Sequence, residues 1–362
     1  MSGVEQYDLF VSGTSGYACY RIPALLATSS GTILAFCEAR KYSCSDSGQI
    51  DLFLRRSADG GRTFGDPVTV ASVPDWVCGN PAPVQDRETG TIRLLFCMNR
   101  ADGDEGMICE GRAPRQVWAC SSDDDGLTWD DPVEITASVK PNDWSWYATG
   151  PGHGVQLASG RLVVPCDHIV LDNRTRQDPY YSHVVYSDDG GETWAVGGST
   201  SEGTNESTAE EVRDGVLYLN CRNKYPLADG GNYRAVAYSL DGGQTFSPVV
   251  HDAALPEPIC QASVLRCRGA GGEPEPLLFA NPAARSGLAR GRHTMTVRVS
   301  RDGGVTWPWN RVLHDGPAAY SDLCFARDGT VVCLYERGEE RPYERLTVAR
   351  FALDWLAGAA QT

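Results

Sequence analysis

Short apolar runs alternate with turn-forming residues along the chain, and this pattern predicts strands. Four clear runs are rich in β-branched or aromatic residues and are bounded by Gly, Asp or Pro, at 32–36, 161–165, 215–219 and 330–335. Runs of this length and composition are typical of strands. Long stretches with the apolar spacing of a helix are absent, and we expect one short helix, at 351–356. The sequence therefore predicts an all-β protein.

An eight-residue motif, Ser-x-Asp-x-Gly-x-Thr-aromatic, recurs five times. Its copies begin at Ser57, Ser122, Ser187, Ser239 and Ser300, with spacings of 65, 65, 52 and 61 residues. In each copy the Ser and Asp side chains can bond nearby backbone N–H groups, and Gly supplies a positive φ where the chain reverses. The aromatic residue is expected to enter the core. We interpret these boxes as structural turns without a catalytic role.

The regular spacing of the boxes predicts the architecture. About six units of the average spacing would fill the 362 residues, and repeats of this length with four strands each are typical of β-propellers. We expect a six-bladed β-propeller of four-stranded antiparallel blades. The unit without a box should close the ring with strands from both chain ends. No Pro/Ser linker or charge run divides the sequence, so we expect a single domain over residues 1–362.

The charge balance restricts the partners. The chain has 47 acidic and 32 basic residues, a net charge of −15. Nucleic acids and anionic membranes attract Lys/Arg surfaces, so neither is expected as a partner. No window approaches 18 unbroken apolar residues, which argues against a membrane span. The first residues lack the basic start and apolar core of a signal peptide. We expect a cytoplasmic protein, or a secreted one if a leader has been removed.

Thirteen cysteines are scattered along the chain without a Cys-x-x-Cys pair. Several lie in apolar runs, such as Cys97, where a thiol serves as a small buried hydrophobe. With no leader we expect reduced thiols. No metal-ligand spacing and no nucleotide fingerprint is present, so we predict neither a metal site nor a cofactor. Structural calcium at the Asp-rich turns stays open as an alternative, although the boxes explain these turns without a metal.

The run Tyr20-Arg21-Ile22-Pro23, followed by the five boxes, resembles the retaining exo-sialidases (neuraminidases) over essentially the whole chain. The resemblance implies that Arg21, Arg222 and Arg292 bind the carboxylate of the substrate. Guanidinium groups suit this task because they bind carboxylates bidentately and keep their charge. Three other arginines compete with the third position: Arg285, Arg290 and Arg298.

The same resemblance implies three catalytic residues. Tyr320 matches the nucleophile, because sialidases use tyrosine instead of a second carboxylate. A carboxylate nucleophile would be repelled by the carboxylate on the reacting carbon. A phenol has an ordinary pKa near 10 and needs a base, and Glu206 matches that base. Asp46, on the loop 41–48, matches the general acid. Two rivals for Glu206 and one for Asp46 remain open: Glu210, Glu211 and Asp51.

Further positions are implied to support the site. Glu336 matches a glutamate that orients the first arginine, and Glu38 and Arg40 match a pair near the ring hydroxyls of the sugar, with Arg40 binding substrate. The aromatic segments 142–147 and 180–181 fit either a sugar site or packing between blades.

Together these residues predict an exo-α-sialidase that hydrolyses terminal sialic acid from glycoconjugates, with retention through a tyrosine-linked glycosyl-enzyme. A sialylated glycan is the expected substrate. One alternative is a hydrolase or transferase for a related nonulosonic acid, such as deaminated sialic acid. Another is a non-catalytic glycan-binding propeller, which should lack part of the catalytic set.

Overall fold

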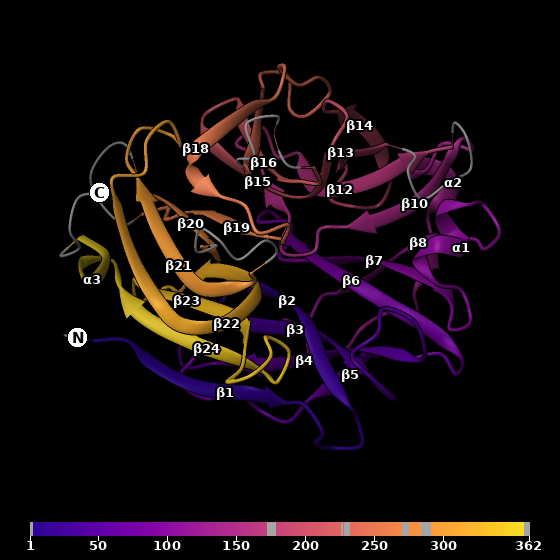
Figure 1. Ribbon diagram of the computed structural model, residues 1–362, viewed down its shortest axis with the longest axis horizontal. Coiled ribbons are helices and arrows are strands. Elements are labelled where there is room, and N and C mark those ends of the chain that lie inside the picture. Colours follow the sequence, from indigo (N-terminus) through magenta and orange to yellow (C-terminus); the bar gives the residue numbers. More distant parts are fainter. Residues whose placement is uncertain are drawn as a thin grey trace.

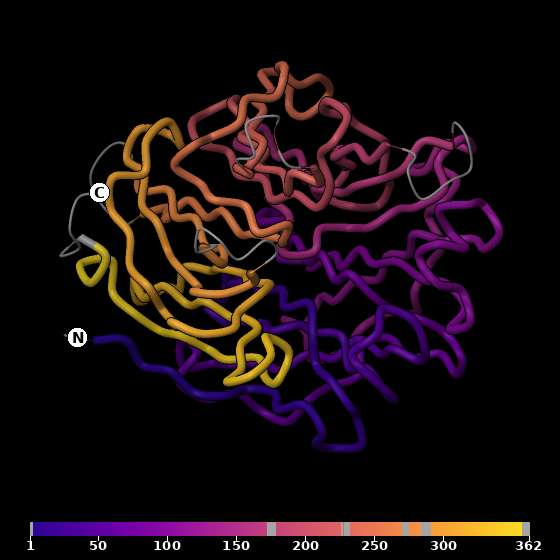
Figure 2. The backbone as a smooth tube through the Cα atoms, in the orientation of Figure 1, coloured from indigo at the N-terminus to yellow at the C-terminus, as the bar shows by residue number. Residues whose placement is uncertain are grey.

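The computed structural model describes residues 3–171, 179–225, 227, 232–269, 275–283 and 291–357. Nearly all of its regular structure is β-strand, which confirms the predicted all-β class. The sheets follow one another around the middle of the molecule in chain order (Figure 1). The backbone tube traces the same circuit, from the indigo N-terminal segment to the yellow C-terminal segment beside it (Figure 2). The site described below lies where these sheets converge.

The described strands form four sheets. The first has the order β1 (Glu5–Val11), β24 (Arg345–Ala352), β23 (Thr330–Arg337), β22 (Trp309–Phe325), β21 (His293–Ser300), β20 (Leu277–Pro282) and β19 (Ser263–Arg266). The second has the order β2 (Cys19–Ala27), β3 (Ile33–Arg40), β4 (Ile50–Ser57), β6 (Trp76–Gln85), β7 (Ile92–Arg100), β8 (Gln116–Ser122) and β9 (Val133–Glu134), and β5 (Val68–Ala71) also pairs with β4.

The other two sheets are smaller. One has the order β10 (Trp144–Thr149), β12 (Leu162–Val170), β13 (Tyr180–Ser187) and β14 (Ala195–Ser199), and β11 (Val155–Gln156) also pairs with β12. The last has the order β15 (Thr204–Arg213), β16 (Val216–Asn223), β17 (Tyr233–Ser239) and β18 (Val250–Pro256). The four predicted apolar runs lie in β3, β12, β16 and β23, so these strand predictions are confirmed.

Pairing in the sheets is antiparallel, apart from one parallel contact between Ile50 and Val77 that joins β4 to β6. The first and last strands, β1 and β24, lie side by side over Glu5–Val11. The long strand β22 pairs with β21 along its first part and with β23 along its second part. The two ends of the chain therefore meet in one sheet.

All five boxes form the predicted turns. In the third box Ser187 Oγ donates to Asp189, and Asp189 accepts from the backbone N–H and the hydroxyl of Thr193. Gly191 N–H donates to Ser187 Oγ, and Gly191 has a φ of 89°, where a side chain would be strained. The box aromatics are buried at Trp194 and Trp307 and half-buried in the other three copies.

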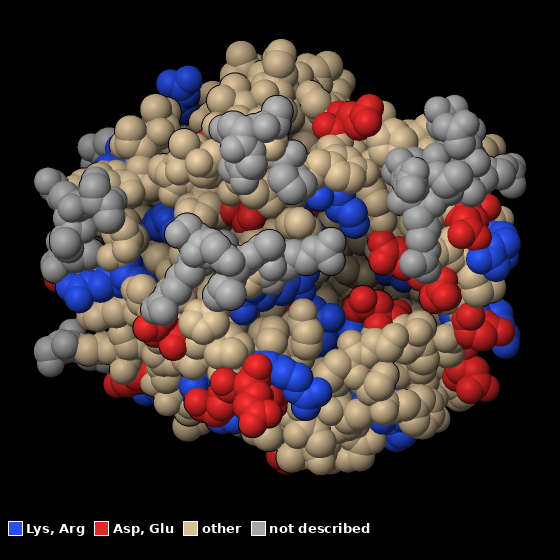
Figure 3. All heavy atoms as spheres, viewed as in Figure 1, with Lys and Arg blue, Asp and Glu red and all other residues tan. Residues whose placement is uncertain are grey.

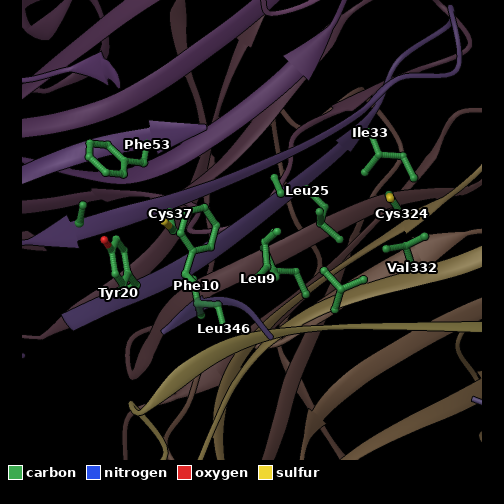
Figure 4. Packing of buried hydrophobic residues seen from close by; sticks show 14 of the residues in the cluster. Leu9, Phe10, Tyr20, Leu25, Ile33, Cys37, Phe53, Cys324, Val332 and Leu346 are labelled. Atoms are coloured by element: carbon green, nitrogen blue, oxygen red, sulfur yellow. The ribbon is translucent and has the colours of Figure 1, made fainter. Parts of the chain in front are cut away.

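The core lies between neighbouring sheets. One buried cluster joins Leu9 and Phe10 of β1 to Leu25 of β2, Val332 of β23 and Leu346 of β24 (Figure 4). Burying an aliphatic or aromatic side chain of this size contributes about 1.5–3 kcal/mol. The cluster therefore fixes β2 against β23, the two strands that carry Arg21 and Glu336.

The structure corrects two sequence-based expectations. Besides α3 (Leu353–Ala357) it contains α1 (Glu105–Cys109) and α2 (Thr136–Val139), which are too short to show a helical period. Helix α3 also begins later than predicted, because Phe351 pairs with Val331 and stays in β24.

The expectation that all cysteines are reduced thiols is also wrong, because Cys19 and Cys44 form a disulfide. Pairing of β2 with β3 sets Cys19 opposite Arg40, next to the loop that carries Cys44, and the spacing in the sequence does not reveal this. The other eleven cysteines are free and buried, as predicted for small hydrophobes.

Candidate active site

Eight of the nine predicted site residues line one cavity of about 410 Å³: Arg21, Glu38, Arg40, Asp46, Glu206, Arg222, Arg292 and Tyr320. The ninth, Glu336, lies directly behind Arg21. They come from strands β2, β3, β15, β16, β22 and β23, from the loop after β3, and from the residue before β21. On the face drawn in Figure 3, charged side chains of both signs gather around a hollow near the middle.

Arg21 is positioned by an irregular stretch of β2. The pairing with β3 shifts between Arg21 and Ala24, and Ile22 has a φ of 59°, which is strained for a β-branched residue. Glu336 holds this conformation by accepting from Ile22 N–H at 3.0 Å and from Arg21 Nε at 3.1 Å. Its other oxygen accepts from Tyr320 N–H at 3.1 Å. One fully buried carboxylate thus fixes the arginine and the tyrosine together.

Arg222 and Glu206 project from the neighbouring strands β16 and β15. Arg222 Nη1 donates to Glu206 at 2.7 Å and to the Tyr320 hydroxyl oxygen at 3.3 Å. The Tyr320 hydroxyl donates to the other Glu206 oxygen at 2.5 Å. The phenol therefore contacts a base and a cation at the same time.

Arg292 also lies against the ring of the tyrosine. Its guanidinium carbon is 5.3 Å from the centre of the Tyr320 ring, the same distance as that of Arg21. Arg292 donates to the Tyr343 hydroxyl and to the backbone carbonyl of Ile259, both at 2.9 Å. The Tyr343 ring also packs under Arg21, 4.0 Å from its guanidinium carbon. Tyr343 therefore joins two of the three arginines.

The electrostatics of the pair Tyr320 and Glu206 favour a protonated phenol beside a carboxylate. Burial, and then the charge of Glu206, raise the pKa of Tyr320 well above its ordinary value. Burial alone would raise the pKa of Glu206, but Arg222 and the hydrogen bond from Tyr320 bring it below the ordinary value. A proton leaving Tyr320 therefore has an ionised acceptor in direct contact.

Asp46 lies on the exposed loop between β3 and β4, and 70% of its side chain is exposed. Its carboxylate is 2.7 Å from Arg40 Nη1 and 3.3 Å from Arg21 Nη1. Arg40 is itself held by Glu38 through Nε and Nη2, at 2.9 and 2.6 Å. Burial by itself would raise the pKa of Asp46, but the charges of Arg40 and Arg21 bring it below its ordinary value.

The rival residues lie elsewhere. Asp51 is buried on β4 and accepts from the Tyr17 hydroxyl at 2.6 Å. Glu210 contacts Arg268 and lines a different cavity, and the Glu211 carboxylate accepts from Ala158 N–H. Arg298 donates to the Asn281 side chain. Arg285 and Arg290 lie outside the described residues.

Residues that sequence reasoning left open or missed complete the lining. Trp146 and Tyr180 line the cavity, whereas Trp144 stacks on His168. Asp167 accepts from Trp146 Nε1 and from Asn205, both at 3.0 Å. Others were not singled out beforehand: Tyr343, Asn80, Arg115, Asp167, Asn205, Lys224 and Glu105. Of these residues, only Asn205 could have been expected near the site from the sequence, because it directly precedes Glu206.

In the described part of the chain, no group of three or more His, Cys, Asp or Glu side chains is arranged to hold a metal ion. No helix in the same part is long and apolar enough to cross a membrane.

The cavity brings together three kinds of chemical group. Three guanidinium groups contact Tyr320, and such groups can bind a carboxylate. The phenol is hydrogen-bonded to a carboxylate that can accept its proton. An exposed carboxylate lies at the edge, where it can reach a leaving group.

The chain is similar to several known proteins over most of its length. Residues 31–333 match the family described as BNR repeat-like domain. A sialidase of Micromonospora viridifaciens is 35% identical over 370 aligned positions, which cover 98% of this chain and 54% of that protein. An exo-alpha-sialidase of Aspergillus fumigatus is 32% identical over 379 positions, covering 94% of this chain and 86% of that protein.

A solved structure, Hadza microbial sialidase Hz136, superimposes with a TM-score of 0.85 at 30% identity, covering 97% of this chain and 69% of the other. The chain spans 54% and 61% of the length of two bacterial relatives, from Micromonospora viridifaciens and Bacteroides fragilis.

Proposed function

This chain belongs to the sialidase family, and on that premise we propose that it is an exo-α-sialidase that removes terminal sialic acid from glycoconjugates. The observation that carries the proposal is the meeting of three arginines with a hydrogen-bonded Tyr–Glu pair in one cavity. The chain has a net charge of −15, so three arginines around one phenol are a local concentration of positive charge, which suits binding of an anion.

We infer that residues 1–362 form a single domain with six four-stranded units, as expected for a six-bladed propeller. The two large sheets support this division. The sheet that begins with β2 divides at the parallel contact between β4 and β6. The sheet that begins with β1 divides at β22, whose first part pairs with β21 and whose second part pairs with β23. The two smaller sheets supply one unit each.

In the proposed mechanism the arginines bind and orient the sugar. Arg21, Arg222 and Arg292 hold the carboxylate on the anomeric carbon, so that this carbon faces Tyr320. Glu336 keeps Arg21 in place, and Arg292 is held by Tyr343 and the Ile259 carbonyl. Because these groups are already ordered, binding costs little reorganisation. Arg40, held by Glu38, faces the same cavity and is assigned to the ring hydroxyls.

Tyr320 then attacks the anomeric carbon. Its phenolic proton passes to Glu206 as the Tyr–carbon bond forms and the bond to the leaving oxygen breaks. Asp46, protonated at this stage, gives its proton to that oxygen. In the second step Asp46 takes a proton from water, which attacks the same carbon. Glu206 returns its proton to the departing Tyr320, and the configuration is retained.

The test is hydrolysis of methylumbelliferyl α-glycosides of N-acetylneuraminic acid and of its deaminated analogue, side by side. We expect the wild type to cleave the first, Tyr320→Phe to lose most turnover, and the first product detected by NMR to be the α-anomer. Preference for the deaminated glycoside would keep the mechanism and change the substrate. A folded wild type that cleaves neither would overturn the proposal and favour a glycan-binding role.

A further inference from the structure

The loop of residues 41–49 connects β3 to β4 and carries Asp46. A disulfide joins Cys44 on this loop to Cys19 at the start of β2. We propose that this disulfide is a positioning element for Asp46, which holds the acid over Arg40 and Arg21 at the edge of the cavity. The inference rests on the proposed function, because it assigns a role to the acid of that reaction.

The position of the disulfide supports this role. Cys19 lies two residues before Arg21, and Cys44 lies two residues before Asp46. The bond therefore joins the segment that carries the first arginine directly to the segment that carries the acid. Its Cα atoms are 5.2 Å apart. Since two residues of extended chain span at most about 7 Å, Asp46 cannot move far from Cys44 while the tether is intact.

The loop has few other connections to the rest of the protein. Its base is closed by hydrogen bonds from Lys41 N–H to the Gln49 carbonyl and from Gly48 N–H to the Ala101 carbonyl, at 3.0 and 2.9 Å. Between these points, Ser43, Ser45 and Ser47 bond to one another within the loop. Within the described part of the chain, residues 42–47 also make polar contacts with two arginines outside this segment, Arg40 and Arg21.

The other contacts of Asp46 are non-covalent. Its side chain is 70% exposed and pairs with Arg40 and Arg21, whose side chains are 3% and 7% exposed, and such ion pairs can break and re-form as the loop moves. One hydrogen bond, from Arg40 Nη1 to the Cys44 carbonyl at 2.7 Å, holds the backbone beside the disulfide. A shift of about 1 Å in a catalytic group can cost about 100-fold in rate. The covalent tether is thus the strongest restraint on the position of Asp46.

Reduction provides a clean way to remove the tether. Dithiothreitol supplies two electrons and two protons, which convert the disulfide to two thiols while the reagent becomes its cyclic disulfide. Cys44 lies on the exposed part of the loop, so the reagent can reach it. The other eleven cysteines are already free and buried, and reduction leaves them unchanged.

Two substrates with different leaving groups distinguish a misplaced acid from a general loss of order in the active site. Release of lactose from sialyllactose needs a proton from Asp46, whereas methylumbelliferone departs without one. The measured quantity is kcat/KM, which reports formation of the glycosyl-enzyme. We compare the wild type before and after treatment with dithiothreitol, Cys19→Ala/Cys44→Ala, and Cys120→Ala, which removes a buried free thiol on β8.

We expect reduction and the double variant to lower kcat/KM for sialyllactose about 10-fold or more, and that for the methylumbelliferyl glycoside less than about 3-fold. The double variant should not respond to dithiothreitol, and Cys120→Ala should keep the wild-type ratio between the two substrates. Equal losses on both substrates, or no loss on sialyllactose after complete reduction, would overturn the positioning role. If the oxidised wild type cleaves neither substrate, the proposed function fails instead.

Discussion

Replacement of Glu336 tests directly whether the site is preorganised, because this residue holds both Arg21 and Tyr320. Its carboxylate is fully buried and accepts from Arg21 Nε, Ile22 N–H and Tyr320 N–H. In Glu336→Gln one oxygen can still accept from Arg21 and Ile22, but the amide nitrogen then faces the Tyr320 N–H, donor against donor. The arginine also loses its buried counter-charge.

The two losses can be estimated separately. An unsatisfied buried N–H costs about 1–3 kcal/mol, and exchanging a charged hydrogen-bond acceptor for a neutral one costs about 1 kcal/mol more. We therefore expect Glu336→Gln to lower the free energy of unfolding by about 2–4 kcal/mol. Removing the side chain in Glu336→Ala strands the guanidinium and should cost about 3–5 kcal/mol.

The assay is urea unfolding followed by tryptophan fluorescence, together with KM for the methylumbelliferyl sialoside. Loss of the orientation of Arg21 should raise KM about 10-fold, which corresponds to about 1.4 kcal/mol of binding. Glu134→Gln, an exposed carboxylate on β9, serves as the control and should change neither quantity. A Glu336→Gln protein with wild-type stability and wild-type KM would refute the structural reasoning.

Three further changes have defined outcomes. Hydrogen bonds from Thr193 and Ser187 lower the pKa of Asp189 to about 2, so its contribution to stability is complete above about pH 4 and is lost as the pH falls toward 2. Because these hydrogen bonds are lost, Asp189→Ala should lower the free energy of unfolding by about 1 kcal/mol at neutral pH, measured by urea unfolding. Arg40 and Arg21 lower the pKa of Asp46 against the effect of burial, so kcat/KM for sialyllactose should fall as the pH rises above that pKa, and Arg40→Gln should move the fall to higher pH in a pH–rate profile. Arg292→Lys keeps the charge but loses the fork that bonds Tyr343 and the Ile259 carbonyl, so KM should rise about 10-fold while kcat changes less.

The sequence could predict the parts of this protein that depend on local patterns. The boxes were identifiable because Ser187, Asp189 and Thr193 satisfy one another within seven residues. The first arginine was identifiable because the run Tyr20-Arg21-Ile22-Pro23 resembles a family motif, and the structure shows that Glu336 holds the positive φ of Ile22 in this run. The same resemblance selected the remaining site residues, and the structure brings all of them except Glu336 to one cavity.

Contacts between distant segments could not be predicted in this way. The partner of Cys19 depends on the register of β2 and β3, and that register includes a shift at Arg21. Tyr343 contacts Arg21 and Arg292 from the connection between β23 and β24, with no motif around it. Helix α1 begins at a local cap, in which the Asp104 side chain accepts from Met107 N–H. Such features follow from tertiary packing, which a periodic pattern does not encode.

The sharing of Arg21 between Asp46 and Glu336 links substrate binding to the acid. Arg21 Nη1 is 3.3 Å from Asp46, while Nε is held by Glu336. A substrate carboxylate bound to Arg21 shares the guanidinium charge with Asp46. It therefore withdraws part of the positive charge that lowers the pKa of Asp46 and places a negative charge nearby. Both changes raise that pKa, so under the proposed mechanism substrate binding itself favours the protonated form that must act next.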